Sequence, residues 1–167
     1  MKKWFFLFLG LPLFFASCTK ADSNTCSYTV SNIIVPSAEA AAMQNYITVN
    51  SISAEDTLGI FYSITDPGTG AVAAVCSNIT VNYTGSLLSN GAVFDSNTTI
   101  AGVSFVLGQL IVGWQRAIPL IRSGGSITIY IPPSLAYGPY DKTDGNGNVV
   151  IPANSYLKFT IHLLDVQ

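Results

Sequence analysis

The residues of this sequence that could form a ligand site are aromatic and aliphatic, with one acid among them. They lie where turns meet expected strands: Tyr83, Phe94, Asp95, Phe105, Leu110, Ile111, Trp114, Tyr137, Ile151 and Phe159. Any one of them, taken alone, is better explained as part of the hydrophobic core. Taken together, the order of the short motifs that contain them is much more specific, and the apolar corner over residues 105–114 is expected to form the floor and wall of an apolar pocket.

The sequence offers little for covalent or metal-assisted catalysis. Its one histidine, His162, lies on an expected strand with no nucleophile near it, and a Ser-His-Asp triad would have to use it. A Gly-x-Ser-x-Gly elbow, a Walker loop and a dinucleotide fingerprint are all absent from the sequence. The acidic, glycine-rich stretch 141–148 has the wrong glycine register for a calcium loop and lacks a closing glutamate. We therefore expect no cofactor and no metal.

The apolar stretch 105–114 is expected to organise the pocket. Its strand-like start ends at Leu107, and Gly108 is expected to permit a turn that most residues resist. Apolar residues then recur at the spacing of one helix face: Trp114, Ala117, Ile118 and Ile121. The pattern predicts a strand that turns into a short helix, with Leu110 and Ile111 at the corner.

Alternating apolar residues predict the strands around this corner. The clearest runs are 57–64, 79–84, 127–131 and 157–163, with shorter ones at 92–95 and 104–107. Turn signals such as Asp66-Pro67-Gly68 and Asn90-Gly91 separate them. Short strands joined by turns favour an antiparallel sheet, and one short helix covers only one face of it. The expected fold class is therefore α+β, with a bent sheet wrapped on a helix.

The first residues resemble a bacterial export signal. Lys2 and Lys3 precede an apolar run over residues 4–16, and Phe15-Ala16-Ser17-Cys18 resembles the lipobox of bacterial lipoproteins. We expect residues 1–17 to be a lipoprotein signal peptide and Cys18 to carry lipid, which would anchor the chain to a membrane of the cell envelope, on its periplasmic or outer-surface side. Ordinary signal cleavage is the alternative. The run falls short of the about 20 apolar residues that a transmembrane helix needs.

Two further cysteines and the charge balance bear on the exported part of the chain. Lipidation of Cys18 leaves Cys26 and Cys76, and an even pair in an exported chain suggests a disulfide; two free thiols are the alternative. Removing residues 1–17 leaves five basic against nine acidic residues, a balance of −4 with no basic cluster. Nucleic acid is therefore not an expected partner. Residues 18–56 are expected to form a tether and an accessory helix over 38–50, capped by Ser37.

The order of short motifs from about Thr57 to the C-terminus resembles the FKBP family, the macrolide-binding peptidyl-prolyl cis-trans isomerases. The motifs are Val81-Asn82-Tyr83-Thr84-Gly85, Asn90-Gly91, Phe94-Asp95-Ser96, Phe105-x-Leu107, Ile111-x-Gly113-Trp114, Ile131-Pro132-Pro133, Leu135-Ala136-Tyr137-Gly138, Ile151-Pro152-Ala153-Asn154 and Leu157-x-Phe159. Each motif is weak alone, but their order is specific. The resemblance implies that residues 57–167 form an FKBP-type isomerase domain, a five-stranded antiparallel sheet curled around a short helix.

The resemblance also implies a role for each pocket residue. Trp114 would be the floor, and the walls would be Tyr83, Phe94, Phe105 and Phe159. Leu110 and Ile111 would edge the pocket, and Ile151 would line its loop side. The backbone N–H of Ile111 and the hydroxyl of Tyr137 would donate to carbonyls of a bound peptide. Asp95 would polarise the pocket near the twisting amide.

Such a pocket suits rotation about an X-Pro bond without a nucleophile. The barrier is about 20 kcal/mol because resonance gives the C–N bond partial double-bond character. Rotation loses that resonance and its charge separation, so a dry apolar pocket favours the twisted amide over the planar one. The expected partners are X-Pro-containing polypeptides of exported proteins, and FKBP-class macrolides as inhibitors. The alternatives are a non-catalytic peptide-binding chaperone module and an envelope lipoprotein whose pocket is only core.

Overall fold

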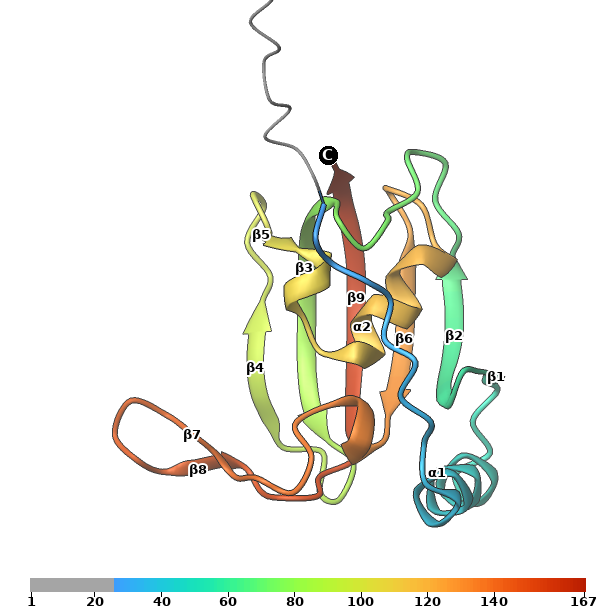
Figure 1. Cartoon of the computed structure of the whole chain (residues 1–167), viewed down its shortest axis with the longest axis vertical. Helices are drawn as coiled ribbons and strands as arrows, with labels where there is room; N and C mark the ends of the chain where they lie inside the picture. Colours follow the sequence, from blue (N-terminus) through green and yellow to red (C-terminus); the bar gives the residue numbers. More distant parts are fainter. Residues whose placement is uncertain (1–25) are drawn as a thin grey trace, which may run out of the picture.

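The computed structural model describes residues 26–167, and Figure 1 shows how their elements are arranged. The predicted signal peptide over residues 1–17 and the predicted lipidation at Cys18 lie outside the described residues. Within residues 26–167 no helix is both long and apolar enough to cross a membrane.

One antiparallel sheet forms the body of the molecule. Its strands are β1 (Glu55–Thr57), β2 (Ile60–Asp66), β3 (Asn78–Leu87), β4 (Val93–Asn97), β5 (Val103–Val106), β6 (Ser126–Ile131) and β9 (Leu157–Val166). They lie in the order β1-β2-β6-β9-β3-β4, and β5 also pairs with β3. The α+β class is confirmed, but this sheet has seven strands where five were expected. The ten-residue β3 pairs with β5 along its first half and with β4 along its second, and the short β1 extends the edge at β2.

The alternation predicted for the last strand is confirmed in β9. Leu157, Phe159, Ile161 and Leu163 are buried, and the residues between them are more exposed. Helix α2 (Val112–Ala117) packs against the sheet in contact with β2 and β6, and Figure 1 shows it lying across the face of the strands. The burial of one face of α2 on one face of β9 and its neighbours makes the main hydrophobic core.

The predicted strand-to-helix corner is present, with two differences. Leu107 opens a 3-10 turn, η1 (Leu107–Gln109), after β5 has ended. The α-helix stops at Ala117 and continues as a second 3-10 turn, η2 (Ile118–Leu120), because Pro119 has no N–H to donate to an α-helical bond. Trp114, Ala117, Ile118 and Ile121 are all buried, which confirms the predicted apolar face.

The accessory helix, α1 (Ser37–Val49), lies beside one end of the sheet, near β1 (Figure 1), and packs on the sheet face that does not carry the main core. Met43 and Ile47 bury their side chains with Phe61 and Tyr130 in a second apolar cluster. The expected cap is wrong: Ser37 is the first helical residue, and Pro36 holds the N-cap position without a side-chain hydrogen bond. Glu39, in the first turn of α1, contacts a different segment: its Oε2 accepts a hydrogen bond of 2.9 Å from the backbone N–H of Ser134.

Two segments lie outside the sheet and its helices. A hairpin of β7 (Lys142–Thr143) and β8 (Val149–Ile151) projects from one end of the molecule. Residues 26–35, which we call the N-terminal strap, run over α2 and then lead into α1 (Figure 1). The strap starts at a disulfide between Cys26 and Cys76, whose Cα atoms are 5.8 Å apart. This stretch therefore does not extend away from the domain as a tether would.

Candidate active site

Nine side chains surround one cavity of about 170 Å³ between α2 and the β3–β4–β5 end of the sheet. They are Tyr83, Phe94, Asp95, Phe105, Leu110, Ile111, Trp114, Tyr137 and Phe159. An apolar cavity of about 150 Å³ holds one benzene ring, so the volume suits one five-membered ring and its adjacent backbone. The structure thus brings together nine of the ten residues selected from the sequence.

Ile151 is the exception. It lies on β8, pairs with Lys142 of β7, and is buried in the main core rather than at the cavity. The hairpin that carries it turns outward, so the buried end of β8 faces the core while its tip is solvent-exposed. Ile151 is thus not among the side chains that line this cavity, and its expected role on the loop side stays a prediction.

Aromatic rings meeting edge to face build the floor and walls of the cavity. The Trp114 ring centroid lies 5.4 Å from that of Tyr83 and 5.3 Å from that of Phe159, with interplanar angles of 84° and 87°. Phe94 meets Phe159 in the same way, at 5.6 Å and 84°. Edge-to-face pairs contribute about 0.5–1.5 kcal/mol each beyond the burial of their area. They therefore hold the indole and its neighbours in fixed positions.

A glycine of β3 makes room for two of these rings. A Cβ atom on Gly85 would lie 2.7 Å from Phe94 Cζ and 2.7 Å from Phe159 Cε1. Gly85 pairs with Asp95 on β4 and with Phe159 on β9, so the close approach comes from both neighbouring strands. Sequence reasoning used Gly85 only as a motif residue. Its position in the middle of a strand is the signal that could have identified this role.

The polar part of the cavity is a pair formed by Tyr83 and Asp95. The Tyr83 hydroxyl donates to Asp95 Oδ2 over 2.6 Å. Burial raises the pKa of Tyr83 well above its usual value, and the hydrogen bond to Asp95 raises it further. The phenol therefore stays protonated at neutral pH and remains a donor to the carboxylate.

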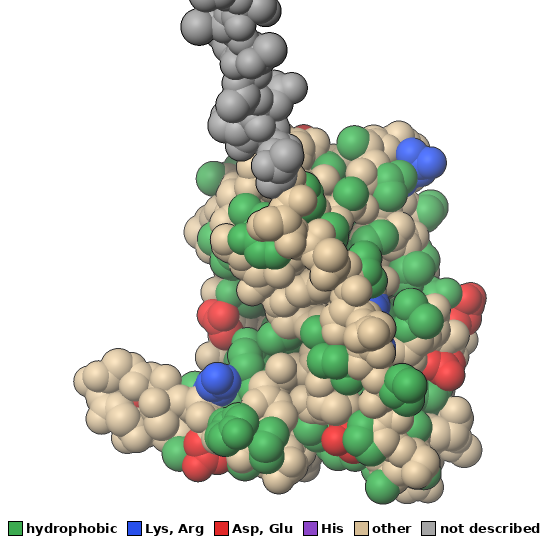
Figure 2. Space-filling model, viewed as in Figure 1, with side chains coloured by type: hydrophobic (Ala, Val, Ile, Leu, Met, Phe, Trp, Pro, Cys, Tyr) green, Lys and Arg blue, Asp and Glu red, His purple; other side chains and the backbone are tan. Residues whose placement is uncertain are grey.

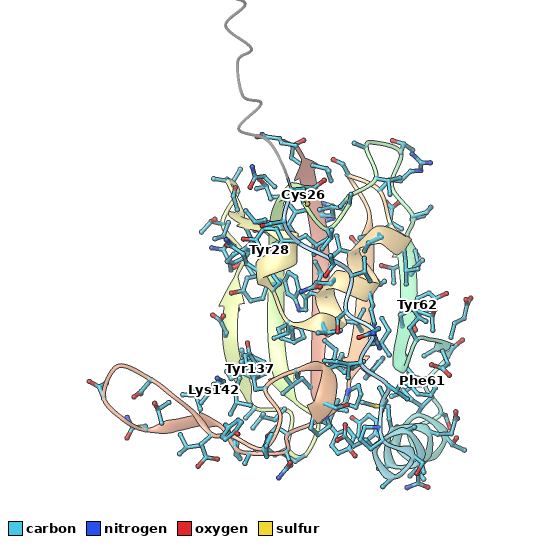
Figure 3. The ribbon with its side chains drawn as sticks, in the orientation of Figure 1. Cys26, Tyr28, Phe61, Tyr62, Tyr137 and Lys142 are labelled. Carbon is cyan, nitrogen blue, oxygen red and sulfur yellow. A yellow bond between two sulfur atoms is a disulfide. The ribbon has the colours of Figure 1, made fainter. Side chains whose placement is uncertain are left out.

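Tyr137 brings a second phenol to the rim of the cavity. It follows the 3-10 turn η3 (Pro133–Leu135), and burial followed by the charge of Asp95 raises its pKa. Lys142 Nζ lies 5.3 Å from the centroid of the Tyr137 ring, and Figure 3 shows the two side chains beside each other. Tyr137 is thus a neutral donor at neutral pH, with a cation over its ring.

The corner between η1 and α2 is held by a glutamine that sequence reasoning missed. Gln115 Nε2 donates to the carbonyl of Leu110 over 2.7 Å and to that of Gly108 over 3.3 Å. Ile111 occupies the N-cap position of α2, where backbone N–H groups have no acceptor within the helix. The side chain of Gln115 therefore fixes the turn that presents this amide.

The groups considered for other chemistry lie elsewhere. His162 Nδ1 is 2.9 Å from Ser126 Oγ and 3.1 Å from the Gly125 carbonyl oxygen, away from the cavity. The Asp144 carboxylate accepts hydrogen bonds from the backbone N–H groups of Asn146 and Asn148, as in an ordinary turn. Across residues 26–167, three or more potential metal ligands do not come together anywhere. In Figure 2 the charged side chains of the visible face lie mainly at its margins.

The family model of the FKBP-type peptidyl-prolyl cis-trans isomerases matches residues 71–164. The chain belongs to this family. All nine residues that line the cavity fall within the matched range, whereas the N-terminal strap and α1 precede it.

Two bacterial proteins are among the relatives of this chain. The chain is 40% identical over 111 residues to the outer membrane protein MIP of Legionella longbeachae, covering 65% of this chain and 45% of that one. It is 38% identical over 125 residues to FkpA of Buchnera aphidicola subsp. Acyrthosiphon pisum, covering 74% and 48%. The chain therefore spans about half the length of the curated relatives it matches.

Solved FKBP-family structures share the fold. The crystal structure of FkpA from Escherichia coli superposes with a TM-score of 0.64 at 32% identity, over 78% of this chain and 60% of that one. A peptidyl-prolyl cis-trans isomerase from Pseudomonas syringae gives a TM-score of 0.65 at 26% identity, over 80% and 97%. The expected FKBP-like architecture is confirmed by these likenesses.

Proposed function

We propose that this protein catalyses cis-trans isomerisation of X-Pro bonds in exported polypeptides. The observation that carries the proposal is the cavity of about 170 Å³ walled by aromatic rings, with Trp114 as its floor and Asp95 as its one charged group. Membership of the FKBP family supports the same activity.

The proline ring of a substrate would enter the cavity and lie on the Trp114 indole. Tyr83, Phe105 and Phe159 surround the floor, so a bound ring is shielded from water on its sides. Ile111 and Tyr137 both line the cavity, and the backbone N–H of Ile111 and the hydroxyl of Tyr137 would donate to substrate carbonyls. Two such anchors hold the chain on either side of the bond that rotates.

Catalysis would come from preferring the twisted amide. Planar amide resonance places negative charge on the carbonyl oxygen and is lost on rotation. With that oxygen turned toward the Asp95 carboxylate, the planar form is disfavoured more than the twisted form, so the barrier falls. Tyr83 keeps the carboxylate in place through its hydrogen bond of 2.6 Å.

We further propose that the protein works in the cell envelope as a lipoprotein anchored through Cys18. The lipobox-like sequence around Cys18 supports this location, as does the Cys26–Cys76 disulfide, because disulfides persist in oxidising compartments. One relative is named an outer membrane protein. Mass spectrometry of the mature N-terminus tests the proposal: an acylated Cys18 supports it, and an unmodified or more distal N-terminus contradicts it.

A protease-free NMR exchange assay tests the activity. Purified residues 19–167 are expected to accelerate cis-trans exchange of an X-Pro peptide, and an FKBP-class macrolide is expected to abolish the acceleration. A folded protein that leaves the exchange rate unchanged would contradict the proposed isomerase activity.

That negative result would favour the non-catalytic chaperone. One observation favours this second candidate: a groove of about 400 Å³ between α1 and the loop 152–156, lined by Tyr46, Leu88, Pro152 and Tyr156 among others. A chaperone would suppress aggregation of an unfolded client protein without accelerating the exchange.

A further inference from the structure

The N-terminal strap is attached to the corner that carries the floor and edge of the cavity. Its first residue, Cys26, forms the disulfide with Cys76. The residues on either side of Cys76 bind the same corner, since the carbonyls of Val75 and Ser77 accept hydrogen bonds from Gly108 over 2.7 Å and from Leu107 over 3.0 Å. The disulfide therefore joins the strap to the segment 75–77, which is hydrogen-bonded to the start of η1.

Tyr28 of the strap lies directly on η1. A Cβ atom on Gly108 would be 2.4 Å from Tyr28 Cγ, and Gln109 Nε2 donates to the Tyr28 hydroxyl over 2.7 Å. Figure 3 shows Tyr28 beside this turn. Gly108 is not among the glycines with positive φ, so the explanation offered from the sequence, an unusual backbone conformation, is wrong. Glycine is needed at this position because the tyrosine ring approaches the backbone closely.

Arg116 attaches the other end of the strap to α2. It is 8% exposed, and its guanidinium donates to the carbonyls of Ser31 over 3.2 Å and Ile33 over 2.6 Å, and also to that of Leu58. Burial lowers its pKa, and its buried Nε has no hydrogen-bond partner among the described residues. Two of the three carbonyls that accept hydrogen bonds from this buried guanidinium therefore belong to the strap, and these bonds offset the cost of burying its charge.

These attachments bracket three of the nine residues that line the cavity. Gly108 and Gln109 precede Leu110 and Ile111, and Arg116 follows Trp114 by two positions. The segment between the attachments contains both edge residues and the floor. A shift of the strap would therefore move the Ile111 amide or the Trp114 indole relative to the walls on β3, β4 and β9.

We propose that the N-terminal strap is a working part of the isomerase site, with Tyr28 and Arg116 as positioning residues for Ile111 and Trp114. The strap lies before the range matched by the FKBP family, so this feature is additional to the matched domain. The inference rests on the proposed function, because it concerns the geometry of the same cavity. A misplacement of about 1 Å costs up to about 100-fold in rate.

The test is a double-mutant cycle on Tyr28 and Gly108 in residues 19–167. The variants are assayed at a temperature at which thermal unfolding curves show that every one of them is folded. Tyr28→Ala is expected to lower kcat/KM for an X-Pro peptide about tenfold, mainly through kcat. Tyr28→Phe keeps the ring and is expected to retain most of the activity. Gly108→Ala should lower kcat/KM when Tyr28 is present. In the Tyr28→Ala background it should leave kcat/KM nearly unchanged, because the clash with the tyrosine ring is then gone.

Tyr62→Phe is the matched control. It also removes a phenol hydroxyl from a side-chain hydrogen bond, that of 2.6 Å to Glu55, but on β2 and away from the cavity. It is expected to leave kcat, KM and the NMR signals of the Ile111 amide and the Trp114 indole N–H unchanged, whereas Tyr28→Ala should shift both signals.

A folded Tyr28→Ala variant with wild-type kinetics and unshifted Ile111 and Trp114 signals would overturn the positioning role. So would a Gly108→Ala effect that is equally large with and without Tyr28. An inactive wild-type protein would contradict the proposed function instead. The two NMR signals would then still decide whether the strap positions the corner.

Discussion

The Tyr83 hydroxyl donates to the Asp95 carboxylate over 2.6 Å, between neighbouring strands β3 and β4. Asp95 pairs with Gly85, two residues along β3 from Tyr83, so the bond is a diagonal contact across the ladder. The tyrosine ring also packs on Trp114 and Phe159. One residue therefore links the charge of the cavity to its aromatic floor.

Removing the Tyr83 hydroxyl tests the importance of this link. Tyr83→Phe keeps the ring but leaves Asp95 without this donor, so we expect kcat to fall severalfold and stability to fall by about 1 kcal/mol. NMR exchange kinetics and urea unfolding measure the two effects. Unchanged kcat in a folded variant would show that the orientation of Asp95 does not depend on Tyr83.

The tyrosines also predict how stability depends on pH. Burial raises the pKa of Tyr83 and of Tyr137, so the folded state binds these protons more tightly than the unfolded state, where the pKa is about 10. The stabilisation is fully present below about pH 10 and is lost as the pH rises toward the folded-state values. Urea midpoints between pH 8 and about pH 11 should show this decline, and a smaller one in Tyr83→Phe. An equal decline in that variant would assign it to other groups.

A substitution of Trp114 can distinguish a catalytic cavity from an ordinary hydrophobic core. The residue is 4% exposed and forms the cavity floor, so Trp114→Leu should remove most isomerase activity while leaving a cooperative, less stable fold. Ile161→Val is the matched control, because Ile161 is buried on β9 without lining the cavity. It should cost about 0.5–1.5 kcal/mol of stability and leave kcat/KM unchanged. Equal losses of activity in the two variants would favour the reading that the pocket is only core.

The disulfide should matter for stability. It closes a loop with a sequence separation of 50 residues, for which the chain-entropy description gives about 4 kcal/mol. The double variant Cys26→Ser/Cys76→Ser and the reduced wild-type protein should therefore show similar, lower urea midpoints. A midpoint equal to that of the oxidised protein would show that the bond does not stabilise the fold.

Lys142 is expected to influence substrate choice. Its ammonium lies over the Tyr137 ring at the rim, where it could pair with an acidic residue next to the substrate proline. Exposed ion pairs contribute about 0.2–1 kcal/mol, so Lys142→Gln should lower kcat/KM for a Glu-Pro peptide by about 1.4- to 5-fold and leave a Leu-Pro peptide unaffected. Lys158→Gln is the control, since Lys158 lies on β9 beside the inward-facing Phe159 and points to the other face of the sheet. Equal effects of both variants would indicate only a general charge effect.

Local pattern determined the features of this protein that depend on neighbours in sequence. The alternation in β9 and the spacing from Trp114 to Ile121 predicted which residues are buried, because side-chain direction repeats every two residues in a strand and about every 3.6 in a helix. The order of motifs likewise located nine of the ten expected cavity residues.

Only the tertiary structure decided the features that depend on distant segments. Gln109 meets Tyr28 across 81 positions, and Arg116 meets Ile33 across 83, so neither contact has a local signal. The need for glycine at positions 85 and 108 arises from rings that approach from other segments. The inward burial of Ile151 and the sharing of β3 between β4 and β5 were set in the same way. These depend on how complete elements pack against one another, which periodicity within a single element does not encode.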